Sequence, residues 1–174
     1  GGGDKPPPPA NLGGIAADAG LRVLLLDLDV QPTLSSYFTL RSHAPGGIYE
    51  LLAFNEQDRS HLVSHTAIDG LDLVLSNDDK GQLNTLLLHA PDGRLRLRNL
   101  LPVFRPHYDL LLIDTQGARS VLLEMAVLAS DIALSPVTPE ILAAREFRRG
   151  TLQLMQDIAP YQRLGIEPPS LHLL

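Results

Sequence analysis

The chain has 174 residues, of which 44% are hydrophobic, and its formal net charge is −6 at pH 7. This length supports one domain whose core buries about 70% of the surface of the unfolded chain. The acidic balance leaves no overall electrostatic footprint for nucleic acid, and the absence of cysteine excludes disulfides and thiolate metal sites. Because the sequence contains neither a membrane-length apolar run nor a signal-peptide pattern, we expect a cytoplasmic protein.

The first segment combines glycines, one lysine and a run of prolines. Three glycines precede Asp4 and Lys5, and residues 6–9 are all proline. A glycine-rich turn with a lysine before a helix is typical of a phosphate-binding loop, although the match to G-x-x-x-x-G-K-[ST] is partial. Proline has no N–H group to direct at a phosphate and favours extended geometry in the residue before it. The proline run therefore predicts a local polyproline II conformation.

A helix and a buried strand follow. Residues 10–20 form a short helical pattern that ends at Gly20, which suits a left-handed C-cap. The run from Val23 to Leu28 is almost continuously apolar, as in a parallel strand covered on both faces. Asp27 and Asp29 lie at its carboxyl end, the edge where open α/β sheets bind ligands. They indicate phosphate chemistry, or else they only end the strand and begin a turn.

The middle of the chain alternates short elements. Residues 46–54 predict a short helix, and residues 71–75 predict a strand that ends at Ser76. The leucine-rich stretch 78–102 predicts two helices, because a turn at 91–93 interrupts it. None of these segments carries a catalytic pattern.

Two further strands follow. The apolar run that begins at Tyr108 ends at Asp114, and a strand over 132–137 must stop at its prolines. Helices are predicted over 119–129 and 140–158. Three buried strands separated by helical segments predict an α/β fold with a mostly parallel sheet and helices on both faces.

Segments 10–31, 108–115 and 129–140 together resemble the ParA/MinD group of deviant P-loop ATPases, and the partitioning (ParA) branch fits best. The similarity runs from Gly1 to about Thr151, and the spacing from Lys5 to Asp29 matches that of the family. The resemblance implies one P-loop ATPase-like domain over 1–174. We expect this domain to be incomplete, because the family's first strand and its C-terminal third have no counterpart here.

The resemblance assigns roles to individual residues, with ATP and Mg²⁺ as cofactors. Lys5 would contact the β- and γ-phosphates, Asp29 would orient the attacking water, and both would count as catalytic. Asp29 and Asp114 would hold the magnesium ion and its water shell. The remaining residues assigned to nucleotide binding are Gly1, Gly2, Gly3, Asp27 and Gln31.

The resemblance also implies a cycle of assembly. An ATP-bound homodimer would bind DNA non-specifically, and a centromere-binding partner protein would stimulate hydrolysis, so that DNA is segregated. The MinD branch instead uses an amphipathic C-terminal helix on membranes, and no such helix is present here. We therefore expect DNA and protein partners but no membrane.

Three departures from the family pattern affect the phosphate loop. The signature first lysine would precede Gly1, a glycine has become Asp4, and the hydroxyl that holds Mg²⁺ has become Pro6. These changes predict impaired ATP hydrolysis and leave a second hypothesis open, a nucleotide-free pseudo-ATPase that acts as an interaction module. A Rossmann dinucleotide-binding domain is disfavoured, because no G-x-G-x-x-G joins a strand to a helix.

Two other groups of side chains are candidates for binding. Arg145, Arg148 and Arg149 share one face of the predicted last helix and form either a small patch for DNA or a partner, or a solvated stripe. The six histidines show no metal-ligand grouping in the sequence, so we interpret them as ordinary surface or loop residues.

Overall fold

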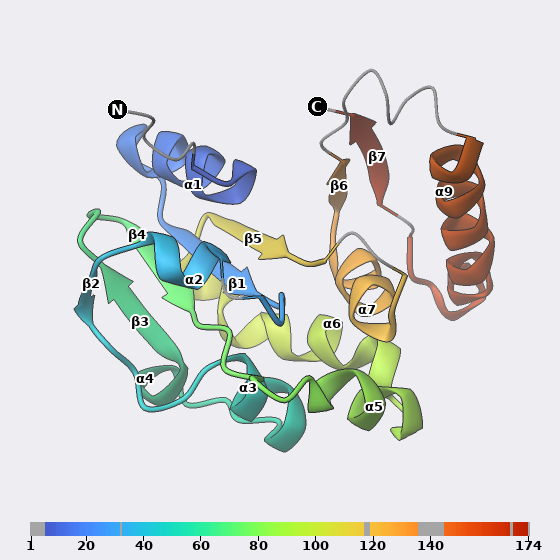
Figure 1. Ribbon diagram of the computed structural model, residues 1–174, viewed down its shortest axis with the longest axis horizontal. Coiled ribbons are helices and arrows are strands. Elements are labelled where there is room, and N and C mark those ends of the chain that lie inside the picture. Colours follow the sequence, from blue (N-terminus) through green and yellow to red (C-terminus); the bar gives the residue numbers. More distant parts are fainter. Residues whose placement is uncertain (1–5, 32, 117–118, 136–144, 168, 174) are drawn as a thin grey trace.

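The computed structural model describes residues 6–31, 33–116, 119–135, 145–167 and 169–173. Its centre is a five-stranded sheet in the order β2-β3-β4-β1-β5 (Figure 1). The strands are β1 (Val23–Asp27), β2 (Leu40–Ser42), β3 (Val63–Thr66), β4 (Leu71–Val74) and β5 (Leu110–Asp114). Strand β1 pairs in parallel with β4 and β5, whereas β3 is antiparallel to β2 and β4. The predicted α/β class with a mostly parallel central sheet is confirmed.

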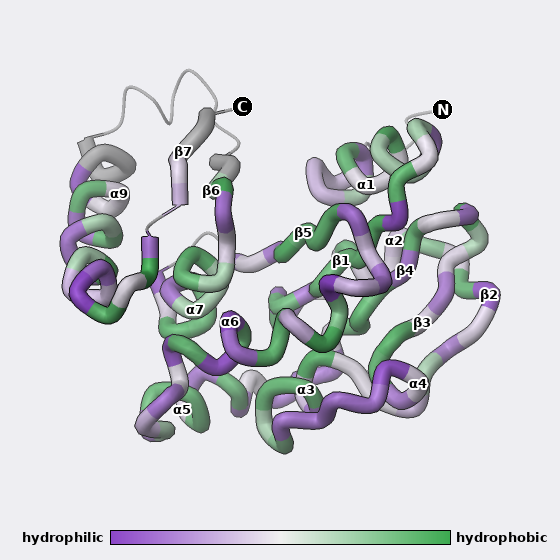
Figure 2. The backbone as a smooth tube through the Cα atoms, turned by 180° about the vertical axis from the view of Figure 1, so that it is seen from behind, coloured by the Kyte–Doolittle hydropathy of each residue, from purple (hydrophilic) through white to green (hydrophobic). Residues whose placement is uncertain are grey.

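Strand β1 is the core of the molecule, and all five of its residues are buried. Leu24 and Leu26 pack on one face of the sheet, while Val23 and Leu25 pack on the other. The first face is covered by α3 (Ile48–Phe54), α5 (Gln82–His89), α6 (Arg96–Leu100) and α7 (Val121–Ala129). The second face carries α1 (Pro8–Asp18) and α2 (Thr33–Tyr37). Figure 2 shows the hydrophobic residues concentrated in β1, β5 and α7.

Helix α1 lies close against the sheet because of Gly13. A Cβ atom at this position would come within 3.1 Å of Leu25 and 3.3 Å of Leu71. Any larger residue would push these two leucines aside in a tightly packed layer. The close contact at Gly13 holds α1 against β1 and β5, the two strands that end in acidic residues.

The proline run does not form a polyproline II segment throughout. Pro7 is the N-cap of α1, with φ −58° and ψ 149°, but Pro8 and Pro9 form the first helical turn, so the prediction is wrong for these two residues. The N–H groups of a first turn have no partner within the helix, and proline therefore costs no hydrogen bond there. The first N–H group engaged within this turn is that of Asn11, which donates to the Pro7 carbonyl at 3.1 Å.

The predicted strand at 132–137 is present but does not join the main sheet. Strand β6 (Ile132–Ser135) pairs in parallel with β7 (Ser170–Leu173) in a separate two-stranded sheet (Figure 1). Ile132 is 58% exposed, so the expectation of a third buried strand in one sheet is wrong. Among the described residues, β5 has no neighbour on its outer edge, and no strand bridges β5 and β6.

Most other predicted elements are confirmed within a few residues. The last long helix is α9 (Arg145–Ile158), and its Leu152 is 64% exposed. Strands β2 and β3 were not predicted, because they are short and carry polar residues. The remaining elements of the described residues are α4 (Arg59–Leu62) and four 3-10 helices, η1 (Gly93–Leu95), η2 (Leu101–Val103), η3 (Arg105–His107) and η4 (Ala159–Leu164). Within the described part of the chain, no helix has both the length and the apolar character needed to cross a membrane.

Candidate functional site

Three carboxylates gather at the carboxyl ends of β1 and β5. Asp27 and Asp114 are direct neighbours in the parallel register, and Asp29 follows two residues after β1. The backbone reinforces this junction, since the N–H of Leu28 donates to the Asp114 carbonyl at 2.9 Å. We refer to Asp27, Asp29 and Asp114 as the acidic edge.

Asp27 is fully buried and holds the loop that follows β1. Its Oδ1 accepts the N–H of Asp29 at 3.1 Å, and its Oδ2 accepts both the N–H and the hydroxyl of Ser35. Burial raises the pKa of this carboxyl, while the hydrogen bonds from Ser35 and Asp29 oppose the rise. With both oxygens engaged, Asp27 positions the loop more than it offers a free ligand.

Asp29 is anchored through its backbone and one carboxylate oxygen. Its Oδ1 accepts the N–H of Gln31 at 2.8 Å, and its carbonyl accepts the hydroxyl of Ser76. Ser76 in turn donates its N–H to the Ser35 hydroxyl at 3.0 Å. This arrangement fixes the Asp29 backbone and leaves its Oδ2 without a hydrogen bond to the described part of the chain. Gln31 is exposed beside it.

Asp114 carries the clearest electrostatic signal at the acidic edge. Burial, followed by the nearby charges of Asp27 and Asp29, raises its pKa to about 6. A carboxyl held between like charges is stabilised by a cation. Hard carboxylate oxygens are the donors that Mg²⁺ prefers, so the residues present fit a magnesium ion held by Asp29 and Asp114.

The phosphate side of the predicted site is less complete. Gly1, Gly2, Gly3 and Lys5 lie outside the described residues, so their predicted contacts stay predictions. At the start of α1, the N-cap and the first two helical positions are prolines, and only Ala10 contributes a free N–H to the first turn. A helix start of this kind offers an anion one backbone donor instead of several.

Ser35 and Ser76 are functional residues that the sequence did not reveal. Their hydroxyls join Asp27 and Asp29 into one hydrogen-bonded unit that spans β1, α2 and the end of β4. A serine after a strand is common, so the only sequence signal near Ser35 was the group of hydroxyl residues Thr33, Ser35 and Ser36 after β1. The hydrogen bonds of Ser35 and Ser76 become apparent only in the folded structure.

One interpretation of the histidines needs correction. Glu56, Asp58 and His61 each offer a ligand atom within 4.8 Å of the others, so a potential metal-ligand grouping does exist. Asp58 already caps α4 by accepting the N–H of Ser60 at 2.9 Å, and Asp58 and His61 are exposed. The sequence concealed this cluster because its spacing matches no familiar motif. Its geometry is accounted for by the start of α4.

Comparison with known proteins places this site in a family. A family model described as an AAA domain (AAA_31) matches residues 1–164. EpsB of Ralstonia solanacearum, named provisionally as a tyrosine-protein kinase, is 29% identical over 159 residues, which cover 91% of this chain and 19% of EpsB. The chromosome partitioning protein ParA of Myxococcus xanthus is 29% identical over 134 residues, or 76% of this chain and 47% of that protein.

A solved structure agrees with these relatives. Cobyrinic acid a,c-diamide synthase from Mycobacterium smegmatis, with bound ADP and magnesium, superposes with a TM-score of 0.77 at 26% identity, covering 94% of this chain and 64% of the other. The chain thus spans less than two thirds of each of these proteins. The matched model, the relatives and the acidic edge agree: the chain belongs to the AAA_31 family and is a member of the ParA/MinD group of P-loop ATPases.

Proposed function

We propose that the chain is the nucleotide-binding part of a ParA-like partitioning ATPase, in which ATP drives a dimer switch that segregates DNA. The observation that carries this proposal is the acidic edge, where Asp27 and Asp114 are paired at the ends of adjacent parallel strands and Asp29 lies close enough to help raise the pKa of Asp114. Relatives named as partitioning proteins support the biological role, and a neighbour solved with ADP and magnesium supports the cofactors.

The residues of the acidic edge take distinct roles in this proposal. Asp29 and Asp114 hold the magnesium ion through carboxylate oxygens, and Mg²⁺ supplies charge neutralisation for the phosphates when it is bound. Asp29 also orients the attacking water through its free Oδ2. Asp27 keeps the loop in place through Ser35 and the Asp29 backbone. Catalysis would therefore depend on positioning and electrostatics without a covalent intermediate.

The proposed partners follow from the family. A second copy of the chain would complete the ATP-bound dimer, DNA would bind the dimer non-specifically, and a centromere-binding protein would stimulate turnover. On this chain, Arg149 is exposed at the proposed basic patch, while the side chains of Arg145 and Arg148 lie outside the described part of the structure. These partners are proposed for the whole protein of which the chain forms a part.

A second candidate function is a nucleotide-free interaction module. The start of α1 favours it, because three consecutive prolines occupy the N-cap and the first two helical positions. Backbone donors that cradle phosphates in relatives would be missing from those positions. The fold would then serve as a scaffold for protein contacts.

A magnesium-dependent nucleotide titration separates the two candidates. In ¹⁵N spectra, Mg-ATP should shift the amide signals of 28–31 and 115 saturably, and Asp114→Asn should remove the magnesium dependence. Asp18→Asn, on the exposed surface of α1, is the matched control and should behave as the unmodified chain. No saturable shift at millimolar Mg-ATP would reject nucleotide binding and favour the interaction module.

A further inference from the structure

A second polar site lies toward the opposite end of the sheet from the acidic edge. A pocket of about 420 Å³ is formed where β2, β3 and α4 meet the segment before β5. Tyr108 precedes β5 and Asp72 stands at the start of β4, so this region lies at the amino ends of the parallel strands. The polar side chains that line it are Ser42, His43, Arg59, Ser60, His65 and Tyr108.

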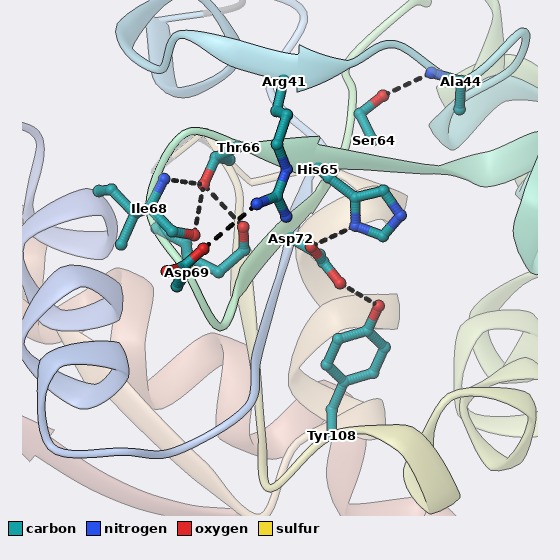
Figure 3. Close-up of polar contacts among 10 residues, drawn as sticks. Arg41, Ala44, Ser64, His65, Thr66, Ile68, Asp69, Asp72 and Tyr108 are labelled. Atoms are coloured by element: carbon teal, nitrogen blue, oxygen red, sulfur yellow. Dashed lines mark hydrogen bonds and ion pairs between the residues drawn. The ribbon is translucent and has the colours of Figure 1, made fainter.

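His65 is exposed, and a hydrogen-bond relay through Asp72 holds its ring. Asp72 lies opposite it in the β3–β4 register, and the His65 Nδ1 lies 2.6 Å from one Asp72 oxygen (Figure 3). The Tyr108 hydroxyl donates to the other Asp72 oxygen at 2.7 Å. Burial and the Asp72 charge raise the pKa of Tyr108, so the phenol stays a donor. Since a carboxylate accepts, the Nδ1 of His65 carries the proton and its Nε2 is left for the pocket.

His43 is constrained in a similar way. Its Nδ1 lies 2.7 Å from the carbonyl of Ala44, and a carbonyl only accepts hydrogen bonds. The proton therefore sits on Nδ1, and Nε2 is again the remaining ring nitrogen. Two imidazoles from neighbouring segments thus have the same nitrogen available. Ser42 lies directly opposite His65 in the β2–β3 register and adds a hydroxyl.

Arg59 supplies the positive charge of the pocket. Elsewhere on the chain, Arg41 pairs with Asp69 at 3.2 Å and Arg22 pairs with Asp109 at 3.0 Å. Within the described residues, Arg59 has no carboxylate oxygen within ion-pair distance, and the neighbouring Asp58 accepts from Ser60 instead. A guanidinium without an acidic partner in a pocket favours an anion and opposes a metal cation.

We propose that this pocket binds a small phosphate-bearing molecule through its phosphate group. Arg59 would make the main contact, and the Ser42 hydroxyl would donate to a second oxygen. Each free imidazole Nε2 accepts from a P–OH group or, when protonated, donates to a phosphate oxygen. Asp72 keeps its negative charge, but its two oxygens are engaged by His65 and Tyr108, so it makes no contact with the ligand in this proposal. The volume falls within the range of small-molecule sites and leaves room beyond the phosphate.

The ring resonances of His43 and His65 report on this pocket and not on the acidic edge, which contains no histidine. Inorganic phosphate and glycerol phosphate, titrated into the chain, should shift the ring signals of His43 and His65 saturably. Arg59→Gln should weaken this binding at least tenfold, and Arg59→Lys should recover part of it. Arg41→Gln is the matched control. Arg41 lies on β2, next to Ser42, but it does not line the pocket and its guanidinium contacts Asp69.

The outcomes are distinguishable from those of the nucleotide proposal. A saturable shift that Arg59→Gln weakens, in a chain whose acidic edge is unchanged, supports the pocket whether or not ATP binds elsewhere. If only glycerol phosphate binds, the ligand is an organic phosphate; if both bind, the phosphate group suffices. Equal weakening by Arg41→Gln, tighter binding of Zn²⁺ than of phosphate at the same rings, or no saturable shift at millimolar phosphate would overturn the proposal.

Discussion

The two halves of the predicted nucleotide site differ in how they are built. On the acidic edge, Asp27 and Asp114 are placed by the ends of two paired strands, and serine hydroxyls fix the loop between them. At the start of α1, prolines occupy the positions whose N–H groups would meet a phosphate. Side chains at strand ends are positioned by sheet pairing, whereas a phosphate cradle depends on the backbone itself. A sequence can therefore keep the first half while it loses the second.

Repair of the phosphate half should produce the largest effect. Replacing residues 4–9 with glycine, lysine, three threonines and alanine should strengthen Mg-ATP binding by two orders of magnitude or more. Two charge-assisted hydrogen bonds at about 1.5–3 kcal/mol each account for this gain. Calorimetric titration of the repaired and unmodified chains measures it. Unchanged affinity would show that the prolines are not what limits binding.

In the protein repaired in this way, Asp29→Ala should abolish ATP turnover and weaken ATP binding much less, because Asp114 still holds the magnesium ion while Asp29 alone is assigned to the attacking water. Steady-state hydrolysis and binding measured on the same preparation test this separation. A parallel loss of both would show that Asp29 acts only through the magnesium ion or the fold and does not orient the water.

Loss of the buried carboxyl should test the structural side of the acidic edge. Asp27→Ala leaves the N–H groups of Asp29 and Ser35 without their acceptor, so the free energy of unfolding should fall by about 2 kcal/mol. Asp18→Ala, on the surface of α1, should change it by no more than about 0.5 kcal/mol. Urea unfolding at pH 7 compares the two variants. Equal effects would reject the role of Asp27 in holding the loop after β1.

Neutralising Asp114 should have a smaller effect of opposite sign. Its pKa is raised to about 6 in the folded chain, so the folded state binds more protons than the unfolded state between pH 4 and 6, and stability falls as pH rises through that window. Asp114→Asn should therefore stabilise the magnesium-free chain by about 1 kcal/mol at pH 8, after allowance for partial exposure, and by less at pH 5. Thermal unfolding of the two proteins across this pH range measures the effect. Destabilisation by Asp114→Asn at pH 8 would contradict the prediction.

DNA binding should show the smallest effect. The chain has a net charge of −6, and its helical basic patch has three arginines at most. Three neutralised phosphates give a log–log salt slope no steeper than about −3. We therefore expect no retention of duplex DNA at physiological ionic strength, with or without ATP. Submicromolar, ATP-dependent binding in a gel-shift titration would show a working phosphate loop.

The sequence predicted the elements that repeat an apolar pattern and the acids that end them. Continuous apolar runs located β1 and β5, and the chemistry at their ends followed from the general behaviour of parallel sheets. Strand pairing was not predictable in the same way. β6 has the same apolar pattern as β5, yet it pairs with β7, because which strand lies beside which is decided by packing between distant segments.

Polar networks were the least predictable part. Ser35 and Ser76 are separated by 41 positions but share a hydrogen bond at the acidic edge. His65 and Tyr108 meet only through Asp72. A local sequence pattern cannot show such contacts, since each partner alone is an ordinary polar residue on a strand or loop. The polyproline II prediction fails at Pro8 and Pro9 because the first turn of a helix tolerates proline, which the interior of a helix excludes.

The affinity of the 174-residue chain for Mg-ATP tests the contrast between the two halves most directly. With the acidic edge in place and the backbone donors of the phosphate half missing, calorimetry should give a dissociation constant of about 0.1 mM or weaker. Removing magnesium should weaken the binding further. A micromolar dissociation constant for the unmodified chain would contradict the account, because it would show that the proline-containing start of α1 binds phosphate as well as an intact loop does.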